Sequence, residues 1–391
     1  MSKPEMVFIF PNCMGGVASF NRNLINFTTL NSQCFIRVIL LEPEGDTRPK
    51  FTDEIRADEV IHFSYSALEK QYDICLRLLK NVGNKPGCII TDSNVVLNMA
   101  AIFNPVKKLI YLVHDYFYVA GALQYQPVID VAVAHASLFC DILLAASPDY
   151  QGKVKYLSYG VELPRQSIKK QAGPALKLIF LGRLVEEKGV KLLKEIDALL
   201  SERNVPVEWT IVGKGPLLGE LKQSWSQNTN VEFVQAADTA SVYAILEHQD
   251  ILVFPSWFEG TPVSIMEALS RGVVPVVSNL PGGTRDMVTE DVGMLCTVKD
   301  AAAYADAISF LHSNRDALSN MQSACLDACG VRFDIRKASD TYFNFFLEQA
   351  ARTPSSKQTA QLIQLSRLDK SFLPGWAVYN FRKFRRYLFQ K

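Results

Sequence analysis

The stretch FPSWFEGTPVSIMEALSRGVVPVVS, residues 254–278, contains the end of one strand, a loop and the start of a helix. The short apolar run before it predicts a buried strand that ends at Phe254. Thr261 is a residue type that caps helix N-termini, and Pro262 is favoured at the first helical position. We therefore predict a strand, a seven-residue loop and then a helix that begins just after Thr261.

Two carboxylates, Glu259 and Glu267, lie on either side of this predicted helix start. The amides of Val263 and Ser264 would point freely out of the first turn, with the helix dipole behind them, and such a terminus binds anions. One carboxylate would then reach a sugar ring and the other a ribose, with phosphate between them. The alternative is that Glu259 is a loop charge and Glu267 belongs to a solvated helix face.

Apolar runs that alternate with helical patterns continue along most of the chain. Near-continuous apolar strands separated by helices predict parallel sheets that are covered on both faces. Two such series in tandem predict an α/β fold of two doubly wound, Rossmann-like domains facing a central cleft, the default ligand site. The predicted strands are 7–10, 37–41, 60–63, 88–91, 109–113 and 142–145, then 176–181, 208–212, 231–234, 251–254 and 274–277; a helix is predicted at 128–139.

Composition excludes several classes of protein. The chain has 391 residues, 48% of them hydrophobic, and a net charge of +1, which gives no sign of a nucleic-acid partner. Its eight cysteines form no CxxC pair, so buried free thiols in a reducing compartment are expected rather than a zinc site. Dinucleotide-binding, P-loop and nucleophile-elbow motifs are absent from the sequence, as is an Asp-x-Asp pair for a divalent metal.

The 254–278 stretch resembles the E-x7-E signature of the retaining GT-B glycosyltransferases of family GT4. In that family the first glutamate contacts the transferred hexose and the second binds the ribose hydroxyls. The resemblance therefore implies a catalytic role for Glu259 and a donor-binding role for Glu267. It also implies that the backbone between them holds sugar hydroxyls and phosphate, at Gly260, Thr261, Pro262 and Val263.

A second stretch, LIFLGRLVEEKGV, resembles the family's strand followed by G-R-x-x-x-x-K-G. Two cations just beyond a strand end suit a diphosphate, because guanidinium grips phosphate in bidentate fashion and ammonium acts as a point charge. The resemblance implies this role for Arg183 and Lys188. The alternative is that both are surface charges paired with Glu186 or Glu187.

Two shorter motifs in the first half resemble the same family. The run PNCMGGVASF follows the first predicted strand, and its Gly15 and Gly16 look like the family's N-terminal glycine loop, which meets donor phosphate or acceptor. A tight turn would also use two glycines. His114 ends a predicted strand and matches the family's H-D position, where histidine contacts the donor hexose; a structural histidine is the alternative, and the other four histidines are expected to be structural.

Weaker matches leave the nucleotide base open. The run VEFVQ resembles the strand whose end faces the donor base, which implies that Val234 lies near the base, although Gln235 replaces the usual glycine. Further departures from the family pattern are Lys214, Tyr159 and Asp286. They leave the reaction class intact but put base preference in doubt.

The polar stretch 166–173 is the predicted junction between domains. We expect an N-terminal acceptor domain at 1–168, a C-terminal nucleotide-sugar domain at 169–352 and a basic amphipathic tail at 353–391. Residues 351–391 hold nine Lys or Arg and one acidic residue, so the rest of the chain has a net charge of −7.

The predicted tail helix has one apolar and one basic face. Ala377, Phe381, Phe384 and Leu388 fall on the first, and Arg382, Lys383, Arg385 and Arg386 on the second. We expect this helix to dock back on the acidic body of the N-terminal domain. The alternative is peripheral contact with an anionic membrane surface, and a lipid-linked acceptor would make both true.

Taken with the resemblance, the sequence predicts a retaining hexosyltransferase that uses a UDP- or GDP-sugar and needs no metal or other cofactor. Its acceptor would be a glycan or a lipid-linked saccharide, in bacterial surface polysaccharide or lipopolysaccharide biosynthesis. A GT-B sugar-nucleotide epimerase and a non-catalytic GT-B binding protein are the alternatives. The N-terminal apolar run is too short for a signal peptide and no 18-residue apolar stretch exists, so a cytoplasmic protein is expected, with the inner face of the cell membrane as its contact if the tail binds lipid.

Overall fold

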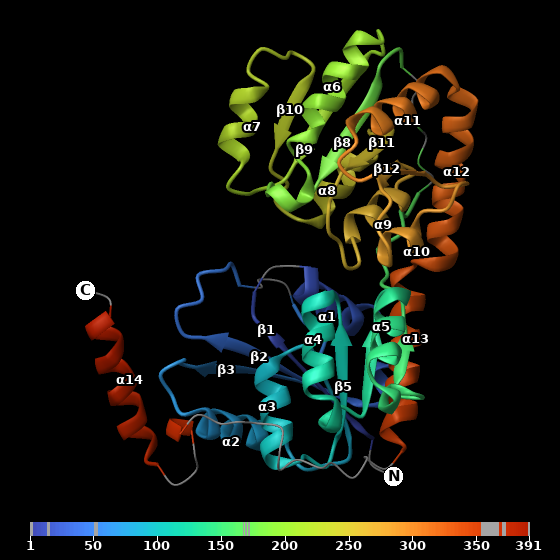
Figure 1. Ribbon diagram of the computed structural model, residues 1–391. Coiled ribbons are helices and arrows are strands. Elements are labelled where there is room, and N and C mark those ends of the chain that lie inside the picture. The colour runs from blue at the N-terminus through green and yellow to red at the C-terminus, as the bar shows by residue number, and fades with distance from the viewer. Residues whose placement is uncertain are drawn as a thin grey trace. The chain divides into compact units, whose positions relative to one another are not determined.

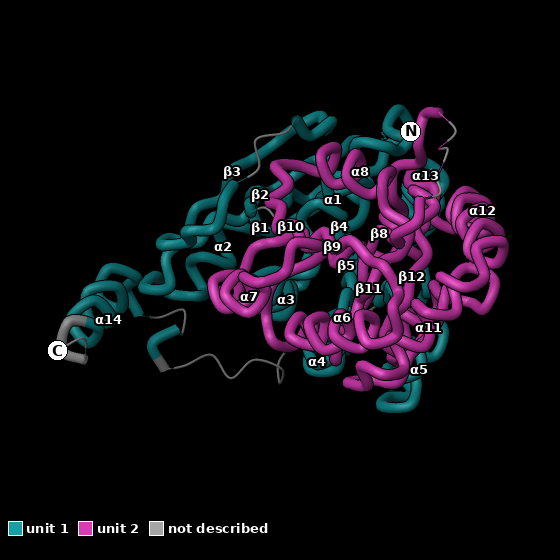
Figure 2. Tube along the Cα trace, turned by 90° about the horizontal axis from the view of Figure 1, so that it is seen from above, with its two compact units in different colours: residues 1–135, 139–157, 336–391 teal, residues 136–138, 158–335 magenta. Residues whose placement is uncertain are grey.

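The computed structural model describes residues 3–13, 16–50, 54–166, 168, 170, 173–352, 367–369 and 373–389. The chain divides into two compact units (Figure 2). Unit 1 comprises Met1–His135, Phe139–Leu157 and Arg336–Lys391, and unit 2 comprises Ala136–Leu138 and Ser158–Ile335. Each unit has its own sheet and its own core.

Unit 1 is built on a seven-stranded sheet with the order β3-β2-β1-β4-β5-β6-β7 (Figure 1). Every adjacent pair of strands in it is parallel. Three of its central strands, β4, β5 and β6, are buried at each residue, so both faces of the sheet are covered. The strands are β1 Glu5–Pro11, β2 Phe35–Pro43, β3 Glu59–Tyr65, β4 Gly87–Thr91, β5 Lys108–Val113, β6 Val131–Ala134 and β7 Val154–Tyr156.

Helices connect these strands and cover the sheet. Each connection returns the chain to the same edge, as parallel pairing requires. Two further helices come from the far end of the sequence and belong to the same unit. The helices are α1 Gly16–Phe27, α2 Gln71–Val82, α3 Asn94–Phe103, α4 Tyr116–Gln124, α5 Ser137–Ala146, α13 Ile335–Ala350 and α14 Gly375–Phe389.

Unit 2 repeats the scheme with a six-stranded parallel sheet of order β10-β9-β8-β11-β12-β13. Its strands are β8 Leu176–Leu181, β9 Val207–Val212, β10 Val231–Val234, β11 Ile251–Phe254, β12 Val274–Ser278 and β13 Met294–Cys296. Its helices are α6 Leu192–Glu202, α7 Leu218–Ser224, α8 Thr239–Leu246, α9 Val263–Leu269, α10 Gly283–Met287, α11 Ala301–Ser313 and α12 Arg315–Arg332. Two Rossmann-like α/β units, as predicted, are thus confirmed.

One stretch of the first unit was predicted wrongly. The predicted helix 128–139 contains strand β6, and the predicted strand 142–145 lies inside helix α5. Both segments are short and apolar, and periodicity cannot separate a buried strand from a buried helix at this length. Strand β6 forms because the Val-Ala-Val-Ala run fits between β5 and β7 with both faces buried.

The predicted domain boundaries also need correction. Helix α13 lies in the predicted second domain, 169–352, yet it packs on unit 1: the Phe8 ring on β1 lies 5.8 Å from that of Phe343 and 5.9 Å from that of Phe346. The chain passes into unit 2 before residue 168, because Val161 exchanges backbone hydrogen bonds with Phe333 and Ile335 of that unit. The packing of the α13 aromatic rings on unit 1 and the hydrogen bonds of Val161 set the boundaries between the units. The polar stretch 166–173 does not.

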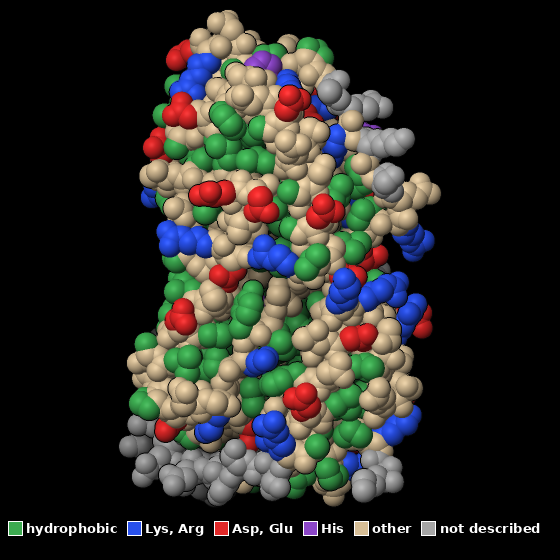
Figure 3. Space-filling view, turned by 90° about the vertical axis from the view of Figure 1, so that its right-hand side faces the viewer, with side chains coloured by type: hydrophobic (Ala, Val, Ile, Leu, Met, Phe, Trp, Pro, Cys, Tyr) green, Lys and Arg blue, Asp and Glu red, His purple; other side chains and the backbone are tan. Residues whose placement is uncertain are grey.

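The surface carries charges of both signs. On the face drawn in Figure 3, acidic and basic side chains are interspersed over both units rather than gathered into one large patch. Within the ranges that the structure covers, none of the helices has the length and apolar character needed to cross a bilayer.

A buried ion pair stabilises the amino-terminal edge of the unit 1 sheet. The Lys107 ammonium lies 2.9 Å from the Glu5 carboxylate and donates hydrogen bonds to the carbonyls of Gly83 and Lys85. Both charged side chains are at most 3% exposed. Arg37 approaches the same carboxylate at 3.5 Å. Such a pair depends on both partners, because either charge alone would be buried without compensation.

We expect Lys107→Met to lower the free energy of unfolding by about 3 kcal/mol, because it leaves the Glu5 carboxylate buried beside Arg37 alone. The double variant Glu5→Gln/Lys107→Met should recover part of this loss. Urea denaturation would measure both. Lys85→Met, at an exposed side chain nearby, is the control and should change stability by less than about 0.5 kcal/mol; equal effects of the two single lysine variants would contradict the assignment.

Candidate functional site

The order of strands in unit 2 identifies the edge where a ligand is expected. Strand β8 comes first in the chain but lies in the middle of the sheet, with β9 and β10 on one side and β11, β12 and β13 on the other. The connections therefore reverse direction between β8 and β11, which pair in parallel. Ligands of doubly wound folds bind at such a switch point, at the carboxyl ends of the strands.

The loops that follow β8 and β11 are held together at this edge. The Ser256 hydroxyl donates to the carbonyl of Glu187 (3.1 Å), and the Trp257 amide donates to the same oxygen (2.8 Å). Gly189 has a φ of +66°, and a Cβ there would lie 2.0 Å from the carbonyl oxygen of Pro255. A glycine is thus required for the two backbones to approach so closely.

Lys188 and Glu259 meet between these two loops. The Lys188 Nζ lies 2.5 Å from Glu259 Oε1, and the side chains are 15% and 7% exposed. The ammonium also lies 5.5 Å from the centre of the Phe254 ring. Because the pair is largely removed from water, it is a strong, charge-assisted hydrogen bond. The structure therefore brings together the predicted phosphate-binding cation and the predicted hexose-contacting carboxylate.

Arg183 lies on the same loop but is exposed. Its guanidinium lies 3.5 Å from the Glu187 carboxylate, and its side chain is 71% exposed. For Arg183 the alternative of a surface pair with Glu187 is thus what the structure shows. A pair of this kind contributes about 0–1 kcal/mol, so it does not fix the guanidinium.

The helix after β11 starts one residue later than predicted. Helix α9 begins at Val263, and Pro262 rather than Thr261 occupies the N-cap position, with no side-chain cap hydrogen bond. Because Pro262, which has no side-chain acceptor, stands at the N-cap position, the prediction that Thr261 caps the helix is wrong. The N-cap residue itself therefore offers no side-chain acceptor to the first-turn amides of α9.

Glu267 lies within α9 and is partly buried. Burial raises the pKa of its carboxyl to about 7, and Arg271 opposes this increase. Among the described residues no hydrogen bond or ion pair holds this carboxylate. The alternative of a fully solvated helix charge therefore does not describe Glu267.

The neighbouring loops complete this edge of unit 2. The loop after β12 packs against the β11 loop so closely that a Cβ at Gly283 would lie 2.2 Å from the Gly260 carbonyl oxygen. The loop after β9 approaches in the same way, with Gly213 against the Gly182 carbonyl. Val234 ends β10, two strands away from β8, at the same edge.

Unit 1 has its own switch point, between β1 and β4. Gly16 begins α1 just after β1, and Gly15 lies outside the described residues. His114 directly follows β5 and is 5% exposed. Its Nε2 lies 3.4 Å from an oxygen of Asp92, the residue that follows β4. The structure thus places the predicted Gly16 and His114 at the carboxyl edge of the unit 1 sheet.

The sequence reasoning missed two of the neighbours of His114. Asp92 matched no motif, although a carboxylate directly after a buried strand is the signal that would have marked it. His135, expected to be structural, packs against His114 with ring centres 4.7 Å apart and the rings tilted by 34°, and it shares a hydrogen bond of 2.7 Å with the Tyr342 hydroxyl. Burial, reinforced by His114, holds the pKa of His135 well below its usual range, so it stays neutral.

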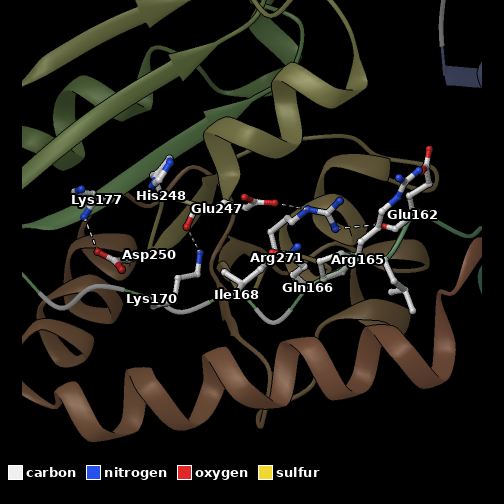
Figure 4. A pocket seen from close by; sticks show the side chains of 12 residues that line it. Glu162, Arg165, Gln166, Ile168, Lys170, Lys177, Glu247, His248, Asp250 and Arg271 are labelled. Atoms are coloured by element: carbon white, nitrogen blue, oxygen red, sulfur yellow. Dashed lines mark hydrogen bonds and ion pairs between the residues drawn. The ribbon is translucent and has the colours of Figure 1, made fainter.

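A pocket of about 490 Å³ in unit 2 lies at the opposite edge of the sheet (Figure 4). Its lining includes Lys177 on β8 and Asp250, which directly precedes β11. The charges there are engaged by the protein itself: Lys170 donates to the carbonyls of Leu246, Glu247 and Gln249 at the end of α8. Arg271 likewise donates to the Glu162 carbonyl, lies 3.6 Å from Glu247 and stacks on Tyr243. These contacts join the segments that line the pocket, so we assign it a structural role.

Unit 1 contains a polar pocket of about 430 Å³ at the carboxyl ends of β1, β2 and β3. Glu42 is central to it, with hydrogen bonds to His62 and Asn12 that lower the pKa of its carboxyl to about 2. Tyr65 and Glu69 line the same pocket. No group of three or more His, Cys, Asp or Glu suited to a metal ion was found among the residues that the structure describes.

Comparison with known proteins agrees with this geometry. Residues 165–325, which hold the whole switch-point edge of unit 2, match the family of glycosyl transferases group 1. WcaL of Escherichia coli (strain K12), named provisionally as a colanic acid biosynthesis glycosyltransferase, is 32% identical over 169 residues, which are 40% of this chain and 41% of WcaL.

A second relative is the UDP-Gal:alpha-D-GlcNAc-diphosphoundecaprenol alpha-1,3-galactosyltransferase of Escherichia coli. It is 26% identical over 173 residues, which are 43% of this chain and 44% of that protein. The chain thus spans less than half the length of each of these two curated relatives.

Solved structures extend the likeness of fold over most of the chain. Anabaena Alr3699/HepE, crystallised with UDP and glucose, superposes with a TM-score of 0.69 at 16% identity, over 88% of this chain and all of that one. Its low identity shows a common fold and no more. The chain therefore has the GT-B fold of that structure, and its residues 165–325 match the family of glycosyl transferases group 1.

Proposed function

We propose that the chain is a retaining glycosyltransferase that transfers a hexose from a UDP- or GDP-sugar to a glycan or lipid-linked saccharide, in the synthesis of a bacterial surface polysaccharide. The observation that carries the proposal is the buried ion pair of Lys188 and Glu259 at the switch point of unit 2. The pair supports the proposal because an ammonium, which can bind phosphate, and a carboxylate, which can accept from sugar hydroxyls, lie within one hydrogen bond of each other.

The donor diphosphate would be held by cationic side chains and backbone amides. Arg183 is exposed and weakly paired, so its guanidinium is available to phosphate oxygens. Lys188 supplies a second positive charge, and the uncapped amides at the start of α9 supply donors. These groups stabilise the negative charge that builds on the departing diphosphate, which is the role a divalent metal fills in other transferases.

We infer that donor binding exchanges the partner of Lys188. When its ammonium turns to the diphosphate, the Glu259 carboxylate loses its buried counter-charge and becomes an acceptor for hexose hydroxyls. An uncompensated buried carboxylate is unfavourable, so the hydroxyls of the correct sugar would be bound strongly. The free protein thus keeps Glu259 in place until the donor arrives.

The transfer itself would be a displacement on one face of the sugar. The bond from the anomeric carbon to the phosphate oxygen breaks, the acceptor hydroxyl oxygen bonds to that carbon, and its proton passes to the departing phosphate. His114, oriented by Asp92, would contact the hexose. No protein nucleophile is part of this proposal.

The relatives support the choice of substrates. One acts, by its name, on a saccharide carried by diphosphoundecaprenol and uses UDP-Gal, and another is named for colanic acid biosynthesis. The structure of similar fold was crystallised with UDP and glucose. A lipid-carried acceptor further suggests peripheral contact of the basic tail with an anionic membrane.

A panel of UDP- and GDP-sugars tests the proposal. We expect at least one of them to raise the melting temperature and to be hydrolysed slowly, with release of the nucleoside diphosphate, and EDTA to leave both unchanged. The absence of any response would overturn the proposal. Release of an epimeric sugar nucleotide in place of hydrolysis would favour the epimerase alternative.

Glu259→Gln should lower this donor hydrolysis by about 100-fold or more, because the hexose loses the carboxylate that orients it. Binding of UDP alone should be no weaker than in the wild type, since Lys188 is released for phosphate. Kinetics and calorimetry would measure the two effects. Glu186→Gln removes an exposed carboxylate from the same region and should change neither; a parallel loss in both variants would count against the assignment.

The proposed ribose contact makes nucleotide binding depend on pH. With a pKa of about 7, Glu267 holds a proton in the free protein below neutrality. Ribose hydroxyls donate more strongly to the ionised carboxylate, so binding would release that proton and tighten as pH rises through 7. The Kd for UDP should fall about tenfold between about pH 6 and pH 8, beyond the change caused by the phosphate itself.

Glu267→Gln isolates this effect, because UDP titrates identically with both proteins. Calorimetry in buffers of different ionisation enthalpy should detect proton release with the wild type and less with the variant. The variant should also bind UDP more weakly at about pH 8. Identical pH profiles for the two proteins would refute a ribose contact through Glu267.

A further inference from the structure

The C-terminal helix α14 is attached to unit 1 through buried charges. The Asp369 carboxylate, 5% exposed as a residue, accepts a hydrogen bond from the Gln71 amide at the start of α2 and one from Arg382 on α14, each 2.8 Å long. The Lys70 ammonium donates to the Leu373 carbonyl at 2.7 Å. A carboxylate at a helix N-terminus is favoured by the helix dipole. These contacts fix how the helix lies on the unit.

The docked face of α14 is narrow and mostly polar. Val378 is 2% exposed, and Arg382 donates to the carbonyl of Glu69 as well as to Asp369. Gly375, three residues before Val378, approaches Asp73 on α2 so closely that a Cβ would lie 2.5 Å from its carboxylate. Residues 375, 378 and 382 share one side of a helix. The apolar face predicted from the sequence, with Phe381 and Phe384, is therefore not the face that contacts unit 1.

The aromatic residues of α14 point to solvent instead. Trp376 is 73% exposed, Phe381 51% and Phe384 62%. At about 100° per residue, the three lie within an arc of about 140° on the side away from Val378 and Arg382. Figure 1 shows α14 at the margin of unit 1, beyond α2 and β3. Three large aromatic side chains on one exposed helix face are not explained by packing among the residues that the structure describes.

Cations border this aromatic face. At about 100° per residue, Lys383 lies about 20° beyond one end of the arc and Arg385 about 40° beyond the other, while Arg386 lies further round, about 80° from Trp376; all three are exposed. Acidic residues are absent from α14. Aromatic side chains flanked by Lys and Arg are the composition of helices that lie in the plane of an anionic bilayer, with the rings among the headgroups and the cations on lipid phosphates.

We propose that the outer face of α14, made of Trp376, Phe381, Phe384, Lys383, Arg385 and Arg386, binds the surface of an anionic lipid bilayer while its inner face stays attached to unit 1. From the sequence, docking on the body and contact with the membrane were alternatives. In the structure they use different sides of one helix. The bilayer is favoured over the acidic body as the partner because the body already occupies the opposite side of the helix.

The position of α14 relates it to the polar pocket of unit 1. Glu69 lines that pocket, and its carbonyl also accepts from Arg382 on α14. Under the proposed function, on which this step rests, membrane contact through α14 would keep a pocket of unit 1 near the lipid surface. The acceptor class that fits is a saccharide carried on a lipid.

Flotation of the full chain with vesicles tests the membrane proposal independently of any enzymatic activity. We expect the protein to float with vesicles of phosphatidylcholine and phosphatidylglycerol in equal parts and to stay behind with phosphatidylcholine alone. Raising the salt should weaken binding, because it screens the cations. Equal flotation with both lipids, or with neither, would overturn the proposal.

Two variants separate the aromatic and the basic parts of the face. Trp376→Ser/Phe381→Ser/Phe384→Ser removes the rings and keeps the charges, whereas Lys383→Gln/Arg385→Gln/Arg386→Gln does the reverse. At about fivefold per cation, the second variant should lower the partition coefficient by about 100-fold. Both changes fall on exposed side chains, so thermal unfolding should match that of the wild type.

Matched controls come from exposed residues elsewhere on the chain. Phe310→Ser/Val331→Ser removes two exposed apolar side chains, and Arg56→Gln/Lys155→Gln/Lys222→Gln removes three exposed cations. Both controls should float like the wild type. If they lose binding as much as the α14 variants do, the attraction is general and α14 is not the contact. If the protein does not bind the vesicles but still responds to nucleotide sugars, the membrane proposal is wrong and the proposed function stands.

Discussion

The ion pair of Lys188 and Glu259 depends on the parallel pairing of β8 and β11 and joins the loops at the edge where we propose that the donor binds. Parallel strands end at the same edge, so the two loops start side by side. Gly189 then lets the backbones come into contact, because any Cβ there would overlap the Pro255 carbonyl. An ammonium and a carboxylate that are 71 residues apart in the chain are thereby held in a site from which water is largely excluded, where their attraction is strong.

Buried charges join distant segments elsewhere in the molecule as well. Lys107 ties the loop before β5 to Glu5 at the start of β1, and Lys170 closes the carboxyl end of α8. Asp369 and Arg382 attach the last helix to α2. In each case the partner is a charge or a set of carbonyls, so the contact is both geometrically specific and costly to break. Apolar packing forms the cores, and these polar contacts select which segments lie on them.

The two units present different chemistry at equivalent edges. In unit 2 the switch point carries cations, uncapped amides and two carboxylates, a set suited to a sugar nucleotide. In unit 1 the equivalent edge carries the His114 and Asp92 pair, with a polar pocket at the neighbouring strand ends. Duplicated topology thus supplies two edges of the same kind, and the residues just beyond the strands give each edge a different set of side chains.

The sequence by itself determined the fold class and most strands, because an apolar run and a glycine turn are local signals; the donor-side residues that it indicates remain a prediction. It failed at 128–146, where strand β6 and helix α5 differ in neighbours rather than in composition. Tertiary structure alone decided that α13 belongs to unit 1, since Phe343 and Phe346 needed the Phe8 ring as partner. It also decided that Lys188 contacts Glu259 and that α14 turns its aromatic face outward. Such outcomes depend on which surfaces meet, and a linear pattern of residues does not contain that information.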